Sequence, residues 1–175
     1  LSLFSPKLRL FWQGRKDWYP KLQDFRTNNP GELIWFHVAS LGEYEQAKPV
    51  ITLLKKQHPK SRVLVSFFSP SGFVPASKKP QEDVDFISYL PLDTPGNARK
   101  MLEVLNPSIV FFVKYDLWYH FLKEIKSRNI PLLLISASFR SDQVYFKKSG
   151  FFRDLLFYFD HIFTSNEPSR KLLSQ

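Results

Sequence analysis

The 175-residue sequence contains no cysteine, which excludes disulfides, cysteine nucleophiles and cysteine-based metal sites. Its four histidines are scattered and show no metal-ligand spacing such as HExxH. No apolar run approaches the ~20 residues of a membrane-spanning helix, and no signal peptide is visible. The six glycines lie far apart, so both the GxGxxG dinucleotide fingerprint and the P-loop are absent. A bound NAD or FAD and a P-loop nucleotidase are therefore not expected.

The composition is that of a folded, basic chain. Hydrophobic residues make up 43% of it and 18 residues are phenylalanine, which argues against disorder, and the length suffices for one domain with its own core. The net charge of +9 attracts polyanions, namely nucleic acid, anionic lipid headgroups or phosphorylated substrates, unless it only solvates the surface. Most aromatic residues lie inside strand-like apolar runs and no known nucleic-acid-binding signature is present. Nucleic acid is therefore not the expected partner.

Residues 1–31 differ from the rest because basic residues alternate there with aromatic ones, among them Trp12 and Trp18. This composition suits a membrane–water interface, where rings lie at headgroup depth and cations meet lipid phosphates. An arm that packs its aromatic side chains on its own domain fits equally well. We predict a membrane-proximal arm at residues 1–31 and one domain at residues 32–175. The chain begins with Leu1 rather than Met, which indicates a piece of a longer protein.

Beyond this arm, strand-like and helix-like segments alternate. The strand-like runs are Leu33–Ser40, Arg62–Ser69, Phe86–Pro91, Ser108–Lys114, Pro131–Ser138 and His161–Ser165. The predicted helices are Glu43–His58, a short one after Ser71, Pro95–Leu105, Leu117–Arg128, Val144–Phe159 and one starting near Glu167. Strict alternation predicts an α/β fold, a Rossmann-like, doubly wound parallel sheet with right-handed crossovers. Six strands suggest the order 3-2-1-4-5-6.

The first strand ends in the run HVASLGE at residues 37–43, which presents a carboxylate where a strand becomes a helix. Ligands bind at this carboxyl edge of open α/β sheets. We expect Gly42 to let the backbone turn tightly and to leave open space in front of Glu43. In the predicted strand order the end of the fourth strand is adjacent, which places Lys114, Tyr115 and Asp116 near Glu43. A glutamate in a first helical turn also complements the helix dipole, so a purely structural role for Glu43 is the alternative.

Two further turns offer binding groups at the same edge. Ser69, Ser71 and Gly72 follow the second strand, where hydroxyls and free N–H groups at a helix start can hold a phosphate or a sugar hydroxyl. An ordinary serine cap is the alternative there. After the fifth strand, Arg140 can make bidentate bonds to phosphate or carboxylate, and Lys147 extends the basic region.

The end of the fourth strand is open to more than one interpretation. Lys114 is expected near the ligand edge, although a solvent-facing lysine is equally compatible with its position. Asp116 is a candidate cap of the following helix, and Trp118 a candidate core residue.

Taken together, these residues resemble the N-terminal half of the bacterial 3-deoxy-D-manno-octulosonic acid (Kdo) transferases of lipid A biosynthesis. The run His37-x-x-Ser40-x-Gly42-Glu43 is similar to the family's HxxSxGE. Supporting matches are SPSG at 69–72, YLPLD at 89–93 with PG at 95–96, LW at 117–118 and SNE at 165–167. Two loops depart from the family pattern. ETELWP becomes KYDLWY at 114–119, and NARLS becomes SASFR at 136–140, which displaces its arginine by two places.

The resemblance implies an inverting GT-B glycosyltransferase, of which this chain is the acceptor-binding domain, inactive without the CMP-sugar domain. Kdo would pass from CMP-Kdo, held mainly by that second domain, to a lipid A precursor, with Glu43 as general base and with no metal or other cofactor. The implied acceptor-binding residues are Ser40, Gly42, Ser69, Ser71, Gly72, Lys114, Arg140 and Lys147. The expected partners are the lipid A precursor, the anionic cytoplasmic face of the inner membrane and the enzyme's own C-terminal domain. The alternatives are a non-catalytic anion- or nucleic-acid-binding module and a GT-B enzyme with another acceptor.

Overall fold

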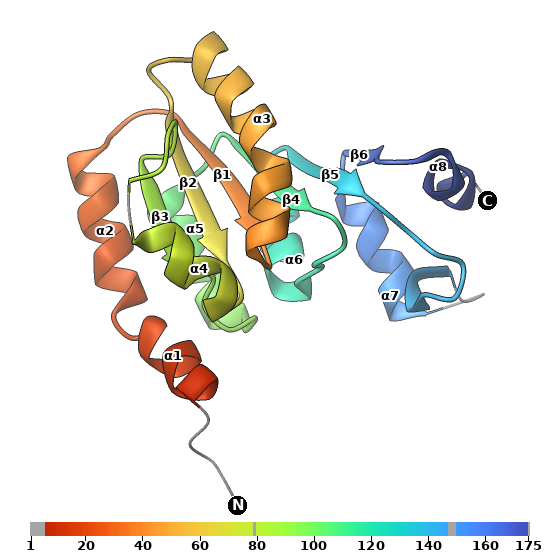
Figure 1. Cartoon of the computed structure of the whole chain (residues 1–175), viewed down its shortest axis with the longest axis horizontal. Coiled ribbons are helices and arrows are strands. Elements are labelled where there is room, and N and C mark those ends of the chain that lie inside the picture. Colours follow the sequence, from red (N-terminus) through yellow and green to blue (C-terminus); the bar gives the residue numbers. More distant parts are fainter. Residues whose placement is uncertain (1–5, 79, 147–149, 175) are drawn as a thin grey trace, which may run out of the picture.

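Six parallel strands form the centre of the molecule (Figure 1). The computed structural model describes residues 6–78, 80–146 and 150–174. The strands are β1 (Leu33–Val38), β2 (Arg62–Phe67), β3 (Phe86–Tyr89), β4 (Ile109–Val113), β5 (Leu132–Ala137) and β6 (His161–Thr164). They lie in the order β3-β2-β1-β4-β5-β6, so the predicted fold class and strand order are confirmed. Strands β2 and β3 lie on one side of β1, and strands β4, β5 and β6 lie on the other. The carboxyl ends of β1 and β4 therefore form the topological switch point.

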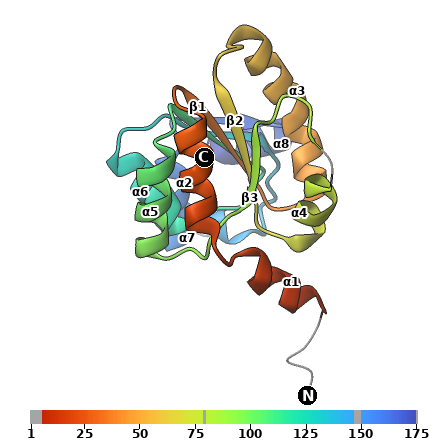
Figure 2. The same cartoon turned by 90° about the vertical axis from the view of Figure 1, so that its left-hand side faces the viewer.

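Helices cover both faces of the sheet (Figure 2). One layer consists of α3 (Leu41–Gln57) and α4 (Pro70–Ser77). The other contains α2 (Trp18–Asn28), α5 (Pro95–Leu105) and α6 (Tyr119–Ser127), while α8 (Glu167–Leu173) follows β6. Two hydrophobic clusters fill the space between the sheet and these layers. Every residue of β1 is buried, as its nearly continuous apolar sequence requires of a strand covered on both faces.

The helix α2, in the second half of the predicted arm, packs against the domain. Leu22 is 0% exposed and Phe25 stacks on Phe86 of β3, with their ring centroids 4.6 Å apart. Both side chains belong to the cluster that α5 and α6 complete. Residues 18–28 are therefore part of a helical layer.

The helix α1 (Pro6–Gly14) lies at the carboxyl edge of the sheet (Figure 1). Arg15, which follows it, is buried and donates hydrogen bonds to the carbonyl oxygens of Phe68 (2.7 Å) and Leu90 (2.8 Å), just beyond β2 and β3. Burial lowers the pKa of Arg15 to about 10. Trp12 remains 53% exposed on α1. No described helix combines the length and the apolar character needed to cross a membrane.

Several helix starts follow the expected capping chemistry, and one does not. Ser69, Thr94 and Asn166 accept hydrogen bonds from backbone N–H groups of α4, α5 and α8. The start of α6 is instead capped from a distance, because the Asp93 carboxylate accepts the N–H groups of His120 and Phe121. The last residue of the YLPLD run therefore has a structural function.

The predicted helix Val144–Phe159 is wrong. The structure has a 3-10 turn at Val144–Phe146, a short helix α7 (Phe151–Asp154) and another 3-10 turn at Leu155–Tyr158. Gly150 precedes α7 with φ 149°, a conformation that interrupts a helix and that residues with a side chain rarely adopt. Leu155 and Leu156 of this stretch are buried, whereas Phe151, Phe152 and Phe157 are exposed.

Candidate active site

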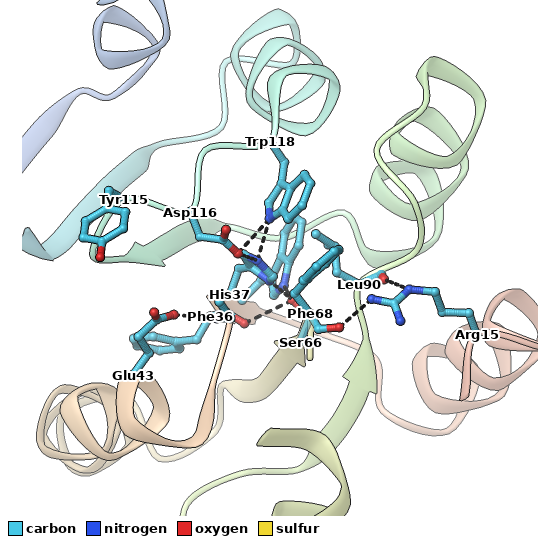
Figure 3. A network of polar contacts seen from close by, with 12 residues as sticks. Arg15, Phe36, His37, Glu43, Ser66, Phe68, Leu90, Tyr115, Asp116 and Trp118 are labelled. Carbon is cyan, nitrogen blue, oxygen red and sulfur yellow. Dashed lines mark hydrogen bonds and ion pairs between the residues drawn. The ribbon is translucent and has the colours of Figure 1, made fainter. Parts of the chain in front are cut away.

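Glu43 lies in the first turn of α3, directly beyond the end of β1 (Figure 3). Its Oε2 accepts a hydrogen bond of 2.5 Å from the backbone N–H of Ala39. The contact resembles one half of a capping box, but the N–H belongs to Ala39, one residue before the N-cap Ser40, and Ser40 makes no reciprocal side-chain bond. Part of the structural interpretation of Glu43 therefore holds. The other carboxylate oxygen makes no hydrogen bond to any residue that the structure describes. One oxygen therefore orients the side chain and the other is available for chemistry.

The surroundings of Glu43 make it a stronger proton acceptor than a free glutamate. Burial raises the pKa of its carboxyl group, because the charged form loses hydration, while the Ala39 N–H opposes this effect. Among the charged neighbours, Asp116 raises the pKa further and Lys114 lowers it. A carboxylate with a raised pKa that is still ionised is suited to general-base catalysis.

A chain of buried hydrogen bonds lies next to Glu43 (Figure 3). His37 is fully buried in β1, with Nδ1 2.9 Å from Ser66 Oγ and Nε2 3.1 Å from Asp116 Oδ2. Trp35 donates to Ser66 Oγ (2.8 Å). The Trp118 N–H lies within hydrogen-bond distance of two acceptors, Asp116 Oδ2 (2.9 Å) and His37 Nε2 (3.0 Å). Asp116 is thus a partner of His37 and not the cap of α6.

Gly42 occupies an ordinary backbone conformation and is not among the positive-φ residues. The expectation that it allows a tight turn is therefore wrong. A Cβ built on Gly42 would meet no atom within 4 Å other than those of its chain neighbours, so the space at Gly42, the residue before Glu43, is open. Gly72 differs, because its Cβ would lie 2.7 Å from the Phe67 side chain and 2.9 Å from the backbone nitrogen of Leu41. Gly72 thus permits α4 to pack closely against the start of α3.

The serines at this edge differ in what their hydroxyls do. Ser69 caps α4 and lies 2.6 Å from Ser71 Oγ, as the structural alternative predicted. Ser40 precedes α3 without a side-chain capping bond, and only its carbonyl oxygen is used, by Tyr44 N–H. Ser40 and the exposed Ser71 are therefore the better candidates for ligand contacts.

Lys114 and Arg140 line one polar pocket of about 580 Å³ at the carboxyl ends of β4 and β5. The other lining residues are Gln46, Tyr115, Ser136, Ser138 and Ser165. Lys114 (φ 66°) and Ser136 (φ 53°) hold left-handed backbone conformations, which cost about 1–3 kcal/mol each and cluster at functional sites. The Arg140 side chain is 72% exposed and pairs with Asp142 at 3.2 Å. Lys147 lies outside the described residues.

Sequence reasoning missed His37 and Ser66 as site residues. A usable signal was present, because each is a polar residue inside an otherwise apolar strand-like run. The two residues are partners in the parallel register of β1 and β2, so their side chains lie on the same face of the sheet. Within the described residues, no group of three potential metal ligands occurs.

The fold and this edge define a Rossmann-like domain that presents a half-buried carboxylate at the switch point of a parallel sheet. The solved structure of a Listeria monocytogenes protein, described as a UDP-N-acetylglucosamine 2-epimerase, shares this fold, with a TM-score of 0.58 at 14% identity. The likeness covers 82% of this chain and 42% of that one. The family model "3-Deoxy-D-manno-octulosonic-acid transferase (kdotransferase)" matches residues 12–175, and the chain belongs to that family.

Individual relatives agree with the family match. A 3-deoxy-D-manno-octulosonic acid transferase of Rickettsia felis is 33% identical over 138 residues, which are 77% of this chain and 29% of that protein. The enzyme of the same name from Haemophilus influenzae is 29% identical over 78% of this chain and 31% of its own length. The Aquifex aeolicus enzyme is 30% identical over 70% of this chain and 32% of its own length. The chain thus spans about a third of the length of these relatives.

Proposed function

We propose that this chain is the acceptor-binding domain of an inverting GT-B glycosyltransferase, which transfers Kdo from CMP-Kdo to a lipid A precursor in lipopolysaccharide biosynthesis. Family membership supports the substrate class. The observation that carries the mechanism is Glu43, half-buried, with one oxygen held by Ala39 N–H and open space beside it at Gly42. A general base must be fixed on a rigid scaffold and still be reached by a substrate hydroxyl.

In the proposed reaction, Glu43 accepts the proton of an acceptor hydroxyl while that oxygen attacks the anomeric carbon of Kdo. The new glycosidic bond forms as the bond from this carbon to the CMP phosphate oxygen breaks, and CMP leaves with the electron pair. Attack opposite the leaving group inverts the configuration. The donor is held mainly by the second domain, and no step assigned to this chain uses a metal or another cofactor.

The distribution of charge and of exposed side chains supports a lipid acceptor. The net charge of +9 favours a phosphorylated, membrane-bound partner over a neutral one. Exposed Trp12 lies on α1, at the same edge of the sheet as Glu43, because Arg15 fixes this helix to the residues beyond β2 and β3. An enzyme seated by α1 on the cytoplasmic face of the inner membrane would therefore turn its acceptor site towards the lipid.

The direct test is transfer by a two-domain protein that contains this chain. Supplied with CMP-Kdo and the tetraacylated, bisphosphorylated lipid A precursor in detergent, it should produce a Kdo-modified lipid that mass spectrometry detects. The chain by itself should bind the precursor and transfer nothing. No transfer by the two-domain protein, together with salt-sensitive binding of RNA or DNA, would contradict the proposal and favour the non-catalytic module.

Lys114 and Arg140 are expected to bind a phosphate of the acceptor in the pocket that they line. Lys114→Ala and Arg140→Ala should each raise the acceptor KM about two- to fivefold at low salt, as expected for charge pairs worth up to about 1 kcal/mol. The difference from wild type should shrink as salt screens the charges. Kinetics with the precursor and with its dephosphorylated form measure this effect.

A matched control is Lys60→Ala, which removes an exposed charge from the turn before β2, at the opposite edge of the sheet. It should leave the acceptor KM unchanged. Equal effects of the three variants, or equal losses with the dephosphorylated acceptor, would show that the pocket does not recognise phosphate.

A further inference from the structure

We propose that His37 and Asp116 are positioning residues of the transfer site, in which buried His37 fixes the Asp116 carboxylate at the switch-point edge that also carries Glu43, the proposed base. This inference rests on the proposed function, since it assigns the proton-accepting step to Glu43. The two residues come from adjacent strands at the switch point. His37 is in β1, and Asp116 lies in the loop that follows β4.

The hydrogen bonds around Ser66 indicate which ring nitrogen of His37 carries the proton. Ser66 Oγ accepts the indole N–H of Trp35 at 2.8 Å, so its own proton must go elsewhere. His37 Nδ1 lies 2.9 Å away, whereas the Phe36 carbonyl oxygen is 3.5 Å away. Donation by Ser66 to Nδ1 leaves a neutral imidazole with its proton on Nε2.

The same tautomer satisfies the other end of the chain. His37 Nε2–H then donates to Asp116 Oδ2 at 3.1 Å, and Trp118 Nε1–H donates to the same oxygen at 2.9 Å. With the proton on Nδ1 instead, Nε2 would accept the Trp118 N–H, which lies 3.0 Å away, and His37 would not hold Asp116. The Nε2–H tautomer, which the Ser66 contacts favour, supplies the Asp116 carboxylate with two fixed donors on one oxygen. Its other oxygen makes no hydrogen bond to the described residues.

Asp116 acts on Glu43 through its charge. The groups that face the Glu43 carboxylate are Asp116 and Lys114 from the loop after β4, and His37 from β1. Tyr115, on the same loop, is drawn on the Glu43 side of the network (Figure 3). Of these, Asp116 favours the protonated form of Glu43 and Lys114 favours the ionised form. Holding Asp116 in place therefore increases the affinity of Glu43 for the proton that it must accept.

A purely structural function does not explain why these groups are polar. Ser66 and His37 are buried in strands whose other side chains are mostly apolar, and buried polar groups cost free energy unless all of them are paired. A pair of apolar side chains would fill the same volume without the free-energy cost of an unpaired polar group. The chain is instead complete from Trp35 to Trp118, and it ends at a carboxylate next to the proposed base.

The test is the pH dependence of kcat/KM in the two-domain enzyme. Asp116→Asn keeps an acceptor oxygen for His37 and Trp118 but removes the charge. The acidic limb of the pH profile of this variant should move to lower pH. Its kcat should fall roughly tenfold, with little change in the acceptor KM. His37→Gln, which keeps a donor for Asp116, should shift the limb less than Asp116→Asn. Asp24→Asn removes an exposed carboxylate of α2 and should leave the profile at its wild-type position.

The outcomes separate this inference from the proposed function. If Glu43→Gln were inactive and the acidic limb of the pH profile were unmoved in Asp116→Asn, the inference would be overturned and Glu43 would remain the base. An active Glu43→Gln would overturn the assignment of the base itself. Nitrogen NMR of the wild-type chain gives an independent check if a variant fails to fold. The neutral His37 ring should carry its proton on Nε2, and a proton on Nδ1 would overturn the inference.

Discussion

Replacing Glu43 by glutamine should reduce Kdo transfer by the two-domain enzyme by a factor on the order of 10³, which lies within the usual contribution of a general base. Glutamine has nearly the same volume, and its amide oxygen can still accept the Ala39 N–H that orients the native side chain. It cannot accept the proton of the attacking hydroxyl. We therefore expect a lower kcat and an unchanged acceptor KM, measured from initial rates over a range of precursor concentrations.

The same substitution should not weaken the fold, and the sign follows from the pKa. Burial raises the Glu43 pKa in the folded state, so the folded protein binds this proton more tightly than the unfolded chain does. Ionised Glu43 therefore costs stability above its folded pKa, and this cost disappears below the unfolded value. Glu43→Gln should melt at or above the wild-type temperature at neutral pH, with a difference that narrows towards acid pH.

A neighbouring glutamate provides the control for both measurements. Glu45 lies on the same helix, is exposed and pairs with Lys48 at 2.6 Å. Such a surface pair contributes about 0–1 kcal/mol, so Glu45→Gln should transfer Kdo at the wild-type rate. If Glu43→Gln retained comparable activity, the proton would have to go to another group, and Glu43 would be only a capping residue of α3.

The sheet could be predicted from the sequence because its determinants are local. Each buried strand is a short apolar run, and the helices between them begin at recognisable caps such as Thr94 and Asn166. Strict alternation of these elements then leaves few possible strand orders. The same order predicted that the loop after β4 lies at the end of β1, and Asp116 of that loop is 3.1 Å from His37 of β1 in the structure.

The features that sequence reasoning missed depend on contacts between distant segments. Asp93 caps α6 although 27 residues separate it from His120, and no local sequence pattern predicts such a cap. The partnership of His37 and Asp116 spans 79 residues and follows only when both the strand register and the loop after β4 are known. Likewise, the apolar residues after Val144 predicted a long helix, but the prediction did not take into account that Gly150 can adopt a backbone conformation that interrupts it.

Gly72→Ala should lower both the stability and the activity of the protein. A Cβ at this position would lie 2.9 Å from the backbone nitrogen of Leu41, which cannot move without displacing the first turn of α3. Overpacking of this kind costs about 1–3 kcal/mol, which corresponds to a loss of roughly 2–12 °C in melting temperature for a chain of this length. Because Glu43 belongs to that turn, transfer should also fall, by up to about a hundredfold for a displacement near 1 Å.

Gly42→Ala is the matched comparison, because it should separate stability from activity at the same turn. A Cβ there meets no protein atom, and the backbone conformation is an ordinary one, so alanine should stabilise the helix start by about 0.5–1 kcal/mol. The methyl group would nevertheless project into the open space beside Glu43, where the acceptor hydroxyl must approach. We expect a higher melting temperature and a clear loss of kcat/KM. Wild-type kinetics in Gly42→Ala would show that no substrate atom enters this space, and the acceptor would then have to reach Glu43 from the side of Lys114.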